Sequence, residues 1–362
     1  MSFNAATSTP VITTAQTRAL SLRWIIGARD DLVWFIGAAL PSYLFFALYI
    51  SNALPVLPIL GAWLLLVDTP HVFATFTRTY FDREERRARR PLLYGSLLFF
   101  LLGPVMVLAG AGAAFFFFAI VWAFYHQIKQ HYGFMVLYKI RNHDLADIDN
   151  ALDRLFLLFS FVYPFAVFIL RSPKMLARVP APLAARLDYL YAALLALTAT
   201  IACAWLLRQI QRAVQRQSIN LPKYLLFAAV IPLYWLVLLA DAPYHLSIVV
   251  LILSPFHTLQ YHRLIWRHNR KYTRDAEARS RYGAITTLIN RHLLGYLAAA
   301  IVFSLGYHLL RRHVIATRGL QDTFTHLVLA FLLGHLLVHF YLDSKIWRVR
   351  RDPHVGKSLN MN

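Results

Sequence analysis

Charged residues are scarce in this chain, and acidic residues are the scarcest. Asp, Glu, Lys and Arg make up 15% of the 362 residues, with 17 acidic against 37 basic side chains, whereas 59% of the residues are hydrophobic. The mean hydropathy of +0.51 lies outside the range of ordinary soluble domains. The shortage of charge therefore argues against a soluble globular fold and indicates a multi-pass membrane protein.

Cysteine and glycine-rich loops are also lacking. The one cysteine, Cys203, lies in an apolar stretch, which excludes an internal disulfide, a CxxC redox pair, a c-type haem attachment site and a four-cysteine iron–sulfur or zinc site. The 14 glycines form neither GxGxxG nor GxxxxGK, so nucleotide binding is not expected. Any metal ion must therefore be held by His, Asp, Glu or the backbone.

Apolar runs long enough to cross a bilayer core of ~30 Å, which takes ~20 residues, recur along the chain. We predict an all-α fold: a polytopic membrane helix bundle with about ten transmembrane helices, in which residues 31–346 form a single domain between an N-terminal tail (1–30) and a basic C-terminal tail (347–362). The first 29 residues lack an apolar run that ends in a cleavage site, so we expect no removable signal peptide. The expected helices cover 31–50, 54–76, 92–109, 113–137, 152–170, 184–207, 222–240, 244–266, 286–310 and 324–346.

The distribution of Lys and Arg predicts the orientation. If the N-terminus is cytoplasmic, 30 of the 37 basic residues fall on the cytoplasmic side and 7 on the other. The positive-inside rule then places both termini in the cytoplasm, in a multi-pass protein of the cytoplasmic (bacterial inner) membrane. Because the basic residues are dispersed over six segments, they are interpreted as topology signals and anionic-lipid contacts, and no nucleic-acid partner is expected.

The last predicted helix carries a stripe of metal-binding side chains. His335, His339 and Asp343 follow one another at i, i+4 spacing, which places them on one helix face with about 5–6 Å between neighbouring Cβ atoms. Two imidazoles and a carboxylate on one face can share a metal ion. Because ionisable residues at membrane depth are costly, the stripe indicates a functional site with partners elsewhere in the chain.

The partners are expected at the cytoplasmic ends of other even-numbered helices. The second helix carries Asp68 and His71. The fourth carries His126 and His131, and the eighth carries His257 and His262. Seven histidines and the carboxylates of Asp68 and Asp343 are enough for one metal ion, and in number for two. The candidate ligands are His71, His126, His131, His257, His262, His335, His339 and Asp343, with Asp68 and Asp343 as candidate catalytic residues.

Spacing divides two of these pairs. His126 and His131, like His257 and His262, are five residues apart, about 140° around a regular helix. One member of each pair is therefore expected to bind the metal and the other to make an outer or substrate contact. Glutamine and tyrosine neighbours are candidates for orienting the imidazoles: Tyr125, Gln127, Gln130, Tyr132, Gln260 and Tyr261. The remaining histidines are interpreted as structural or interfacial: His143, His245, His268, His292, His308, His313, His326 and His354.

The histidine spacing resembles that of known membrane enzymes. H-x4-H at His126/His131 and His257/His262, with H-x3-H at His335/His339, resembles the histidine boxes of integral-membrane di-iron desaturases and hydroxylases. The chain has no His-His doublet, which those families typically contain. Isolated helix histidines are also similar to the single-iron sites of Brp/Blh-type carotene-cleaving dioxygenases. An early His with a late HxxxH resembles membrane zinc hydrolases of the ceramidase and adiponectin-receptor kind.

Three functions remain open at this point. The leading hypothesis is an O2-dependent non-haem iron oxidoreductase, with one or two iron ions, that hydroxylates, desaturates or cleaves a lipid or isoprenoid chain and receives electrons from a cytoplasmic donor protein. The second is a zinc-dependent hydrolase of a lipid amide or ester with Asp68 or Asp343 as base. The third is a non-enzymatic haem- or quinone-binding or transport protein.

Overall fold

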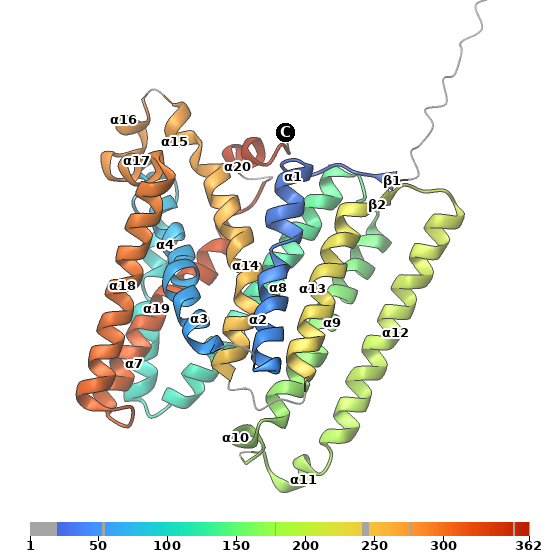
Figure 1. Cartoon of the computed structure of the whole chain (residues 1–362), viewed down its shortest axis with the longest axis horizontal. Helices are drawn as coiled ribbons and strands as arrows, with labels where there is room; N and C mark the ends of the chain where they lie inside the picture. The colour runs from blue at the N-terminus through green and yellow to red at the C-terminus, as the bar shows by residue number, and fades with distance from the viewer. Residues whose placement is uncertain are drawn as a thin grey trace, which may run out of the picture.

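The structure, a computed structural model, is an all-helical bundle of long rods that run side by side (Figure 1). It describes residues 20–52, 55–177, 179–240, 246–275, 277–349 and 352–361. Parts of the two predicted tails (1–19, 350–351 and 362) and His245 lie outside the described residues.

Eight spans of the described chain are long and apolar enough to cross a membrane. This agrees with a multi-pass membrane protein. The first three spans are composite, pairing α1 (Ala28–Asp30) with α2 (Ala39–Ser51), α3 (Val56–Trp63) with α4 (Thr69–Arg78), and α6 (Arg90–Ser96) with α7 (Phe99–Leu108). The other five are single helices: α9 (Asp147–Arg171), α12 (Leu187–Val214), α13 (Leu221–Leu239), α18 (Leu293–Arg318) and α19 (Thr323–Ile346).

Two more long helices lie in the bundle with these spans. They are α8 (Gly112–Arg141) and α14 (Leu246–Asn269), at the positions of the fourth and eighth predicted helices. Both bury polar side chains, His126 on α8 and His257 on α14 among them. The shorter elements are β1 (Leu20–Ser21), α5 (Arg83–Ala88), α10 (Pro173–Leu176), α11 (Ala181–Ala184), β2 (Ile219–Asn220), α15 (Lys271–Arg274), α16 (Ala278–Tyr282), α17 (Ala284–Arg291) and α20 (Pro353–Ser358).

The ninth predicted helix, 286–310, begins later than expected. Its first residues form the separate helix α17, and α18 starts at Leu293. His292 between them has an extended backbone (φ −124°, ψ 141°), which interrupts the helical hydrogen bonds. α17 thus ends at the polar residues Arg291 and His292, and the long apolar helix α18 begins after them.

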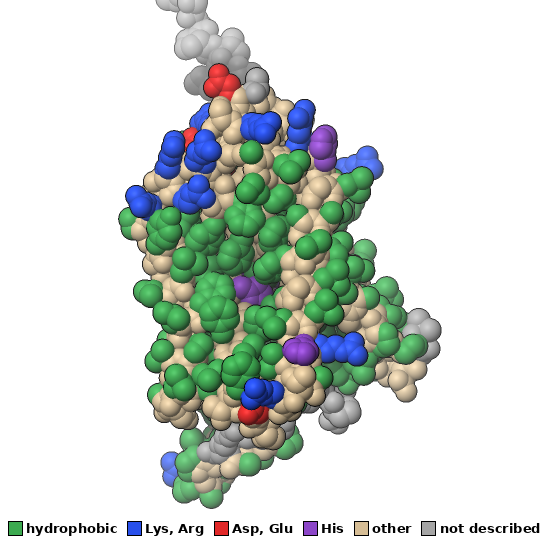
Figure 2. Space-filling model, turned by 90° about the vertical axis from the view of Figure 1, so that its left-hand side faces the viewer, with side chains coloured by type: hydrophobic (Ala, Val, Ile, Leu, Met, Phe, Trp, Pro, Cys, Tyr) green, Lys and Arg blue, Asp and Glu red, His purple; other side chains and the backbone are tan. Residues whose placement is uncertain are grey.

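Both described ends of the chain lie at the same end of the bundle. β1 pairs in parallel with β2, Leu20 opposite Ile219, and α20 lies at that end too (Figure 1). The predicted basic tail thus contains a short packed helix, with Val355 buried in the main core cluster. Lys and Arg side chains gather toward this end above a broad hydrophobic band, with fewer at the opposite end (Figure 2).

Glycines allow α19 to pack closely against α7. A Cβ added at Gly334 would lie 2.7 Å from the Phe100 Cα atom, and one at Gly103 would lie 2.7 Å from the Ala330 carbonyl oxygen. Small residues that let two helix backbones approach are the usual means of packing helices in membranes. Gly334 directly precedes His335, so this contact helps to set the position of the histidine-bearing face of α19.

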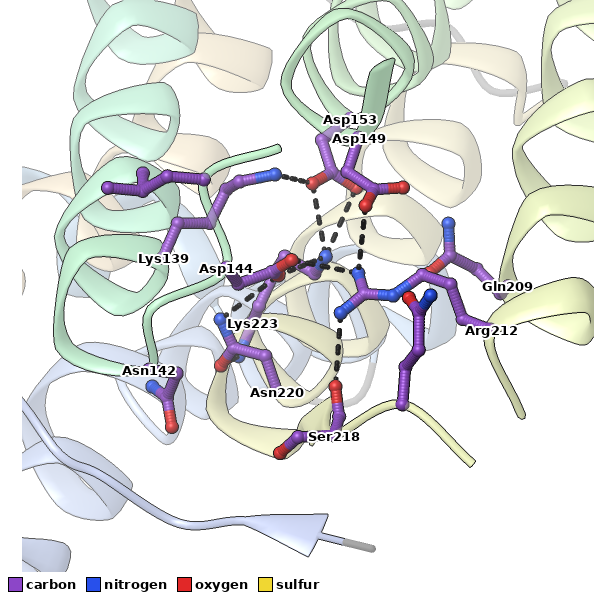
Figure 3. Close-up of polar contacts among 12 residues, drawn as sticks. Lys139, Asn142, Asp144, Asp149, Asp153, Gln209, Arg212, Ser218, Asn220 and Lys223 are labelled. Atoms are coloured by element: carbon purple, nitrogen blue, oxygen red, sulfur yellow. Dashed lines mark hydrogen bonds and ion pairs between the residues drawn. The ribbon is translucent and has the colours of Figure 1, made fainter. Parts of the chain in front are cut away.

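A buried ionic network joins α8, α9, α12 and α13 (Figure 3). The Lys223 Nζ atom lies 2.8 Å from Asp144 Oδ2 and 3.0 Å from Asp153 Oδ2. Lys139 pairs with Asp153, and Arg212 Nη1 lies 2.8 Å from Asp144 Oδ1. Asp144 lies in the connection between α8 and α9. Burial alone would raise its pKa, but the positive charges of Lys223, Lys139 and Arg212 lower the pKa below its ordinary value.

Candidate metal centre

Four buried histidines from four helices meet inside the bundle. His71 comes from α4, His126 from α8, His257 from α14 and His339 from α19, and each is exposed by 7% or less. Their ring centroids form a closed circuit, with distances of 5.0 Å (His71–His257), 4.9 Å (His257–His126), 4.8 Å (His126–His339) and 4.9 Å (His339–His71). We call these four residues the histidine cluster.

The local sequence on α4 prepares the position of His71. α4 begins directly after a π-helical segment, Leu64–Asp68. Pro70, which has no N–H to donate, lies in the first turn of α4. Such wide turns inside helices are frequent at functional sites because they redirect side chains. The His71 Nδ1 atom donates a hydrogen bond to the Asp68 carbonyl oxygen, so that its Nε2 lone pair points away from its own helix backbone.

Several ring nitrogens of the histidine cluster have no hydrogen-bond partner within the described part of the chain. These are Nε2 of His126, Nδ1 of His257 and Nε2 of His339. In addition, Nε2 of His71 and Nε2 of His257 lie only 3.3 Å apart. Buried polar atoms are nearly always paired in proteins. Unpaired imidazole nitrogens that converge are therefore a donor set suited to a metal ion.

Donor spacing is close to that of a ligand set. His71, His257 and His339 each offer an atom within 4.8 Å of the others, and so do His126, His339 and Asp343. Ligand atoms bound to a common ion at ~2.0–2.2 Å lie at most about 4.4 Å apart. Shifts of a few tenths of an ångström would thus bring either group to ligand distances. His339 belongs to both groups, which are therefore neighbours inside the bundle.

A hydroxyl network holds Asp343 and His339 in place. The Tyr261 hydroxyl donates to Asp343 Oδ1 over 2.9 Å, and the Thr75 hydroxyl donates to the same oxygen over 3.2 Å. The Thr75 oxygen lies 2.8 Å from His339 Nδ1, which is also 3.6 Å from Asp343 Oδ2. A proton on His339 Nδ1 satisfies this contact and leaves Nε2 free as a ligand.

The structure separates both histidine pairs as their five-residue spacing requires. His126 and His257 belong to the cluster, whereas His131 packs among the rings of Phe161, Tyr234 and Phe256. His262 uses both ring nitrogens elsewhere: Nε2 donates to the Val67 carbonyl oxygen over 2.9 Å, and Nδ1 accepts from the Tyr296 hydroxyl over 3.0 Å. His131 and His262 thus lie outside both ligand groups.

His335 and Asp68 also lie outside the two groups. The His335 Nδ1 atom donates to the Leu332 carbonyl oxygen, and its ring packs 4.7 Å from that of Tyr307. The Asp68 carboxylate accepts a hydrogen bond from the Thr258 hydroxyl over 3.0 Å. Asp68 therefore contributes to the cluster through its backbone carbonyl, which orients His71. Of the predicted stripe on α19, His339 and Asp343 face the centre together.

Sequence reasoning missed Thr75. It stands four residues after His71 on α4 and so shares its helix face, which was the available signal. Tyr261 has the same relation to His257. Of the glutamines named as orienting candidates, Gln130 donates to the His257 carbonyl oxygen over 2.8 Å, whereas Gln127 accepts from Tyr234.

A cavity of about 820 Å³ reaches the centre from the protein surface. Buried His126 and Tyr261, together with Asp343, line its inner part, and exposed Lys129 and Arg348 line its outer part. Pockets that bury small molecules typically measure about 300–1,000 Å³. The centre is thus connected to a space large enough for an organic substrate.

Comparisons with protein-family models, with curated proteins and with solved structures find no match for this chain.

Proposed function

We propose that this chain is an integral membrane oxidoreductase in which His71, His126, His257 and His339, with Asp343, hold non-haem iron. The observation that carries the proposal is the circuit of four buried imidazoles with unpaired ring nitrogens. Imidazole with one carboxylate is a ligand set that suits iron. Bound iron would supply O2 activation at the inner end of the cavity.

The proposed substrate is a lipid or isoprenoid chain. Aromatic and aliphatic side chains, Trp122, Leu264 and Phe340 among them, line the cavity that leads to the centre. Hydroxylation of such a chain consumes O2, two electrons and two protons and releases one water; desaturation consumes the same reactants and releases two waters. The electrons would come from a cytoplasmic donor protein, whereas oxidative cleavage of a double bond by O2 needs no donor.

The protein's own groups have distinct roles in this proposal. The apolar cavity wall orients the chain, and burial of the centre excludes bulk water. Asp343 completes the ligand set or, through Thr75, fixes the outer nitrogen of His339. We further propose ten membrane crossings with both termini in the cytoplasm, since α8 and α14 are as long as the eight apolar spans and lie among them.

A zinc hydrolase is the second candidate, and the position of Asp343 favours it. This carboxylate lines the cavity and is held by two hydroxyl donors, which is the placement needed to activate a water against a lipid amide or ester. The two functions differ in metal and in oxygen dependence.

The test is elemental analysis of the purified protein with single-residue variants. We expect about one or two iron ions per chain, lost in His71→Ala, His257→Ala and His339→Ala because each removes a converging ligand. His313→Ala is the matched control, since His313 is an exposed residue of α18. Zinc in place of iron would support the hydrolase, and metal retained in all three cluster variants would contradict a metal centre.

Lipid extracts test the reaction. Cells with and without the protein, grown with oxygen, should differ by a lipid that has gained an oxygen atom, lost two hydrogens or been shortened. A difference that persists without oxygen and consists of released fatty acid would replace the oxidoreductase with the hydrolase.

A further inference from the structure

Three basic side chains surround the outer part of the 820 Å³ cavity. Lys129 on α8, Lys345 on α19 and Arg348 just beyond α19 all line it. Among the described residues, no carboxylate lies within ion-pair distance of any of the three, although most other buried or half-buried cations of the chain have one. Three positive charges without a carboxylate partner thus line one cavity.

The three cations are also close enough to repel one another. Lys129 feels the positive charges of Arg154 and Arg348, and Lys345 and Arg348 are three residues apart in the sequence. Their other contacts are neutral: the ring of Tyr132 lies 4.8 Å from Lys129, the ring of Tyr341 lies 5.5 Å from Lys345, and Arg348 Nε donates to the Ser344 carbonyl oxygen over 3.3 Å. Clustered like charges without a counter-ion raise the free energy of the protein, and an anion between them lowers it.

Apolar and metal-binding side chains line the same cavity as the basic residues. Trp122, Leu264 and Phe340 supply apolar surface, and His126 and Asp343 belong to the candidate ligand groups. A molecule that matches this lining has an anionic group and an apolar chain that reaches the histidine cluster.

We infer that this cavity binds an amphipathic lipid whose anionic head group, a carboxylate or a phosphate, contacts Lys129, Lys345 and Arg348 while its apolar chain extends to the histidine cluster. The inference rests on the proposed function in that it names the substrate class of the same site. The head group fixes the depth of the chain, so that one segment of it lies next to His126 and Asp343.

Binding of a fluorescent fatty acid tests the inference. The purified full-length protein, treated with a chelator so that no metal binds the carboxylate, is titrated with cis-parinaric acid and, separately, with its uncharged methyl ester. We expect the acid to bind about tenfold or more tightly than the ester, with an affinity that falls as salt is added. If the unmodified protein binds the acid and the ester equally well, or if salt does not weaken binding of the acid, the inference is wrong.

Matched variants locate the binding site. Lys345→Ala/Arg348→Ala should weaken acid binding about tenfold and leave ester binding unchanged, because only the head-group contacts are lost. Arg274→Ala/Arg279→Ala removes the same charge from exposed positions near α15 and α16 and should change neither. The charge-preserving pair Lys345→Arg/Arg348→Lys should retain acid binding. If Arg274→Ala/Arg279→Ala weakens acid binding as much as Lys345→Ala/Arg348→Ala does, the binding depends on the overall surface charge and the inference is wrong.

Two further arms complete the design. Competition by anionic phosphatidylglycerol would identify a phospholipid head group as the ligand, and its failure to compete would identify the free fatty acid; either result retains an anionic lipid. Metal content is measured on the untreated protein. Acid-selective binding in a protein that holds no metal would overturn the proposed function alone, and metal with equal binding of acid and ester would overturn this inference alone.

Discussion

At the scale of single residues, the centre depends on which nitrogen of each imidazole is free. The Asp68 carbonyl oxygen contacts Nδ1 of His71, and the Thr75 hydroxyl contacts Nδ1 of His339, which leaves Nε2 of each imidazole as the nitrogen available to a metal ion. These outer contacts fix tautomer and ring orientation, which metal-bound histidines require. Their partners therefore matter nearly as much as the ligands.

Asp343→Asn and Tyr261→Phe test this network. The amide keeps the shape of Asp343 but removes its charge, and the Phe variant removes the hydroxyl that donates to it over 2.9 Å. We expect product per unit of protein to fall about 10- to 100-fold in both, with little change in protein yield. Tyr94→Phe, at an exposed position of α6, is the control. Full activity in both network variants would mean that Asp343 has no role in the reaction.

Residue spacing predicted part of the centre from the sequence alone. The five-residue separation of His126 from His131 and of His257 from His262 required that each pair divide, and the structure divides both. The i, i+4 stripe did not reveal that His335 would turn toward Tyr307. A helical stripe covers about two turns, and which part faces a neighbour depends on helix crossing, which local spacing does not encode.

At the scale of helices, α19 is positioned by its close contact with α7. Hydropathy predicted α19, and the span that α6 and α7 form together, to within a few residues, because long apolar runs are a strong signal. Their mutual rotation follows from Gly334 and Gly103, which meet residues far away in the sequence. Such pairings cannot be read from one chain without knowing which helices are neighbours.

Gly334→Ala tests this contact, with Gly306→Ala as a matched control on α18. A Cβ at Gly334 would meet the Phe100 backbone at 2.7 Å, whereas nothing lies within 4 Å of one at Gly306. We expect Gly334→Ala to lower thermal stability, by about 1–3 kcal/mol, and to reduce metal content because α19 shifts. Gly306→Ala should be neutral or slightly stabilising. Equal melting temperatures for the two variants would show that α7 and α19 are not in close contact.

The ionic network predicts loss of stability in acid. The pKa of Asp144 is lowered in the folded protein from an ordinary value of 3.8, because the attraction of Lys223, Lys139 and Arg212 outweighs the effect of burial. Its contribution to stability is therefore present above pH 3.8 and is lost as the pH falls through the lower folded value. Melting temperatures measured from pH 6 to about pH 3 should decrease toward the acid end.

Asp153→Asn should reproduce this loss at neutral pH. The change leaves Lys139 and Lys223 beside a neutral side chain in a buried site, which costs about 3–5 kcal/mol. Asp188→Asn, at an exposed position at the start of α12, should cost little. If Asp153→Asn is as stable as the parent protein, the network is not closed as in Figure 3.

At the scale of the whole molecule, the number of membrane crossings decides on which side of the membrane each connection between helices lies. Composition and the 30-to-7 distribution of basic residues predicted a bundle with both ends on one side. β1 and α20 lie at one end of the bundle, with α10 and α11 at the other (Figure 1). Eight spans satisfy length and hydropathy, whereas α8 and α14 are less apolar because they carry the polar residues of the centre and the network.

Cysteine labelling distinguishes ten crossings from eight. Both counts place the two termini on the same side, so fusions at the termini are uninformative. The two counts differ in the side on which they place the connections before and after α12. If α8 and α14 cross the membrane, Ala185 is outside and Gln217 is cytoplasmic; if they do not, the two sides are reversed.

Both residues are exposed, and the single native thiol is removed first by Cys203→Ser. In intact cells, a membrane-impermeant maleimide should label Ala185→Cys at once and Gln217→Cys only after the membrane is opened. The opposite order would place α8 and α14 outside the set of crossing helices and would overturn the proposed ten crossings.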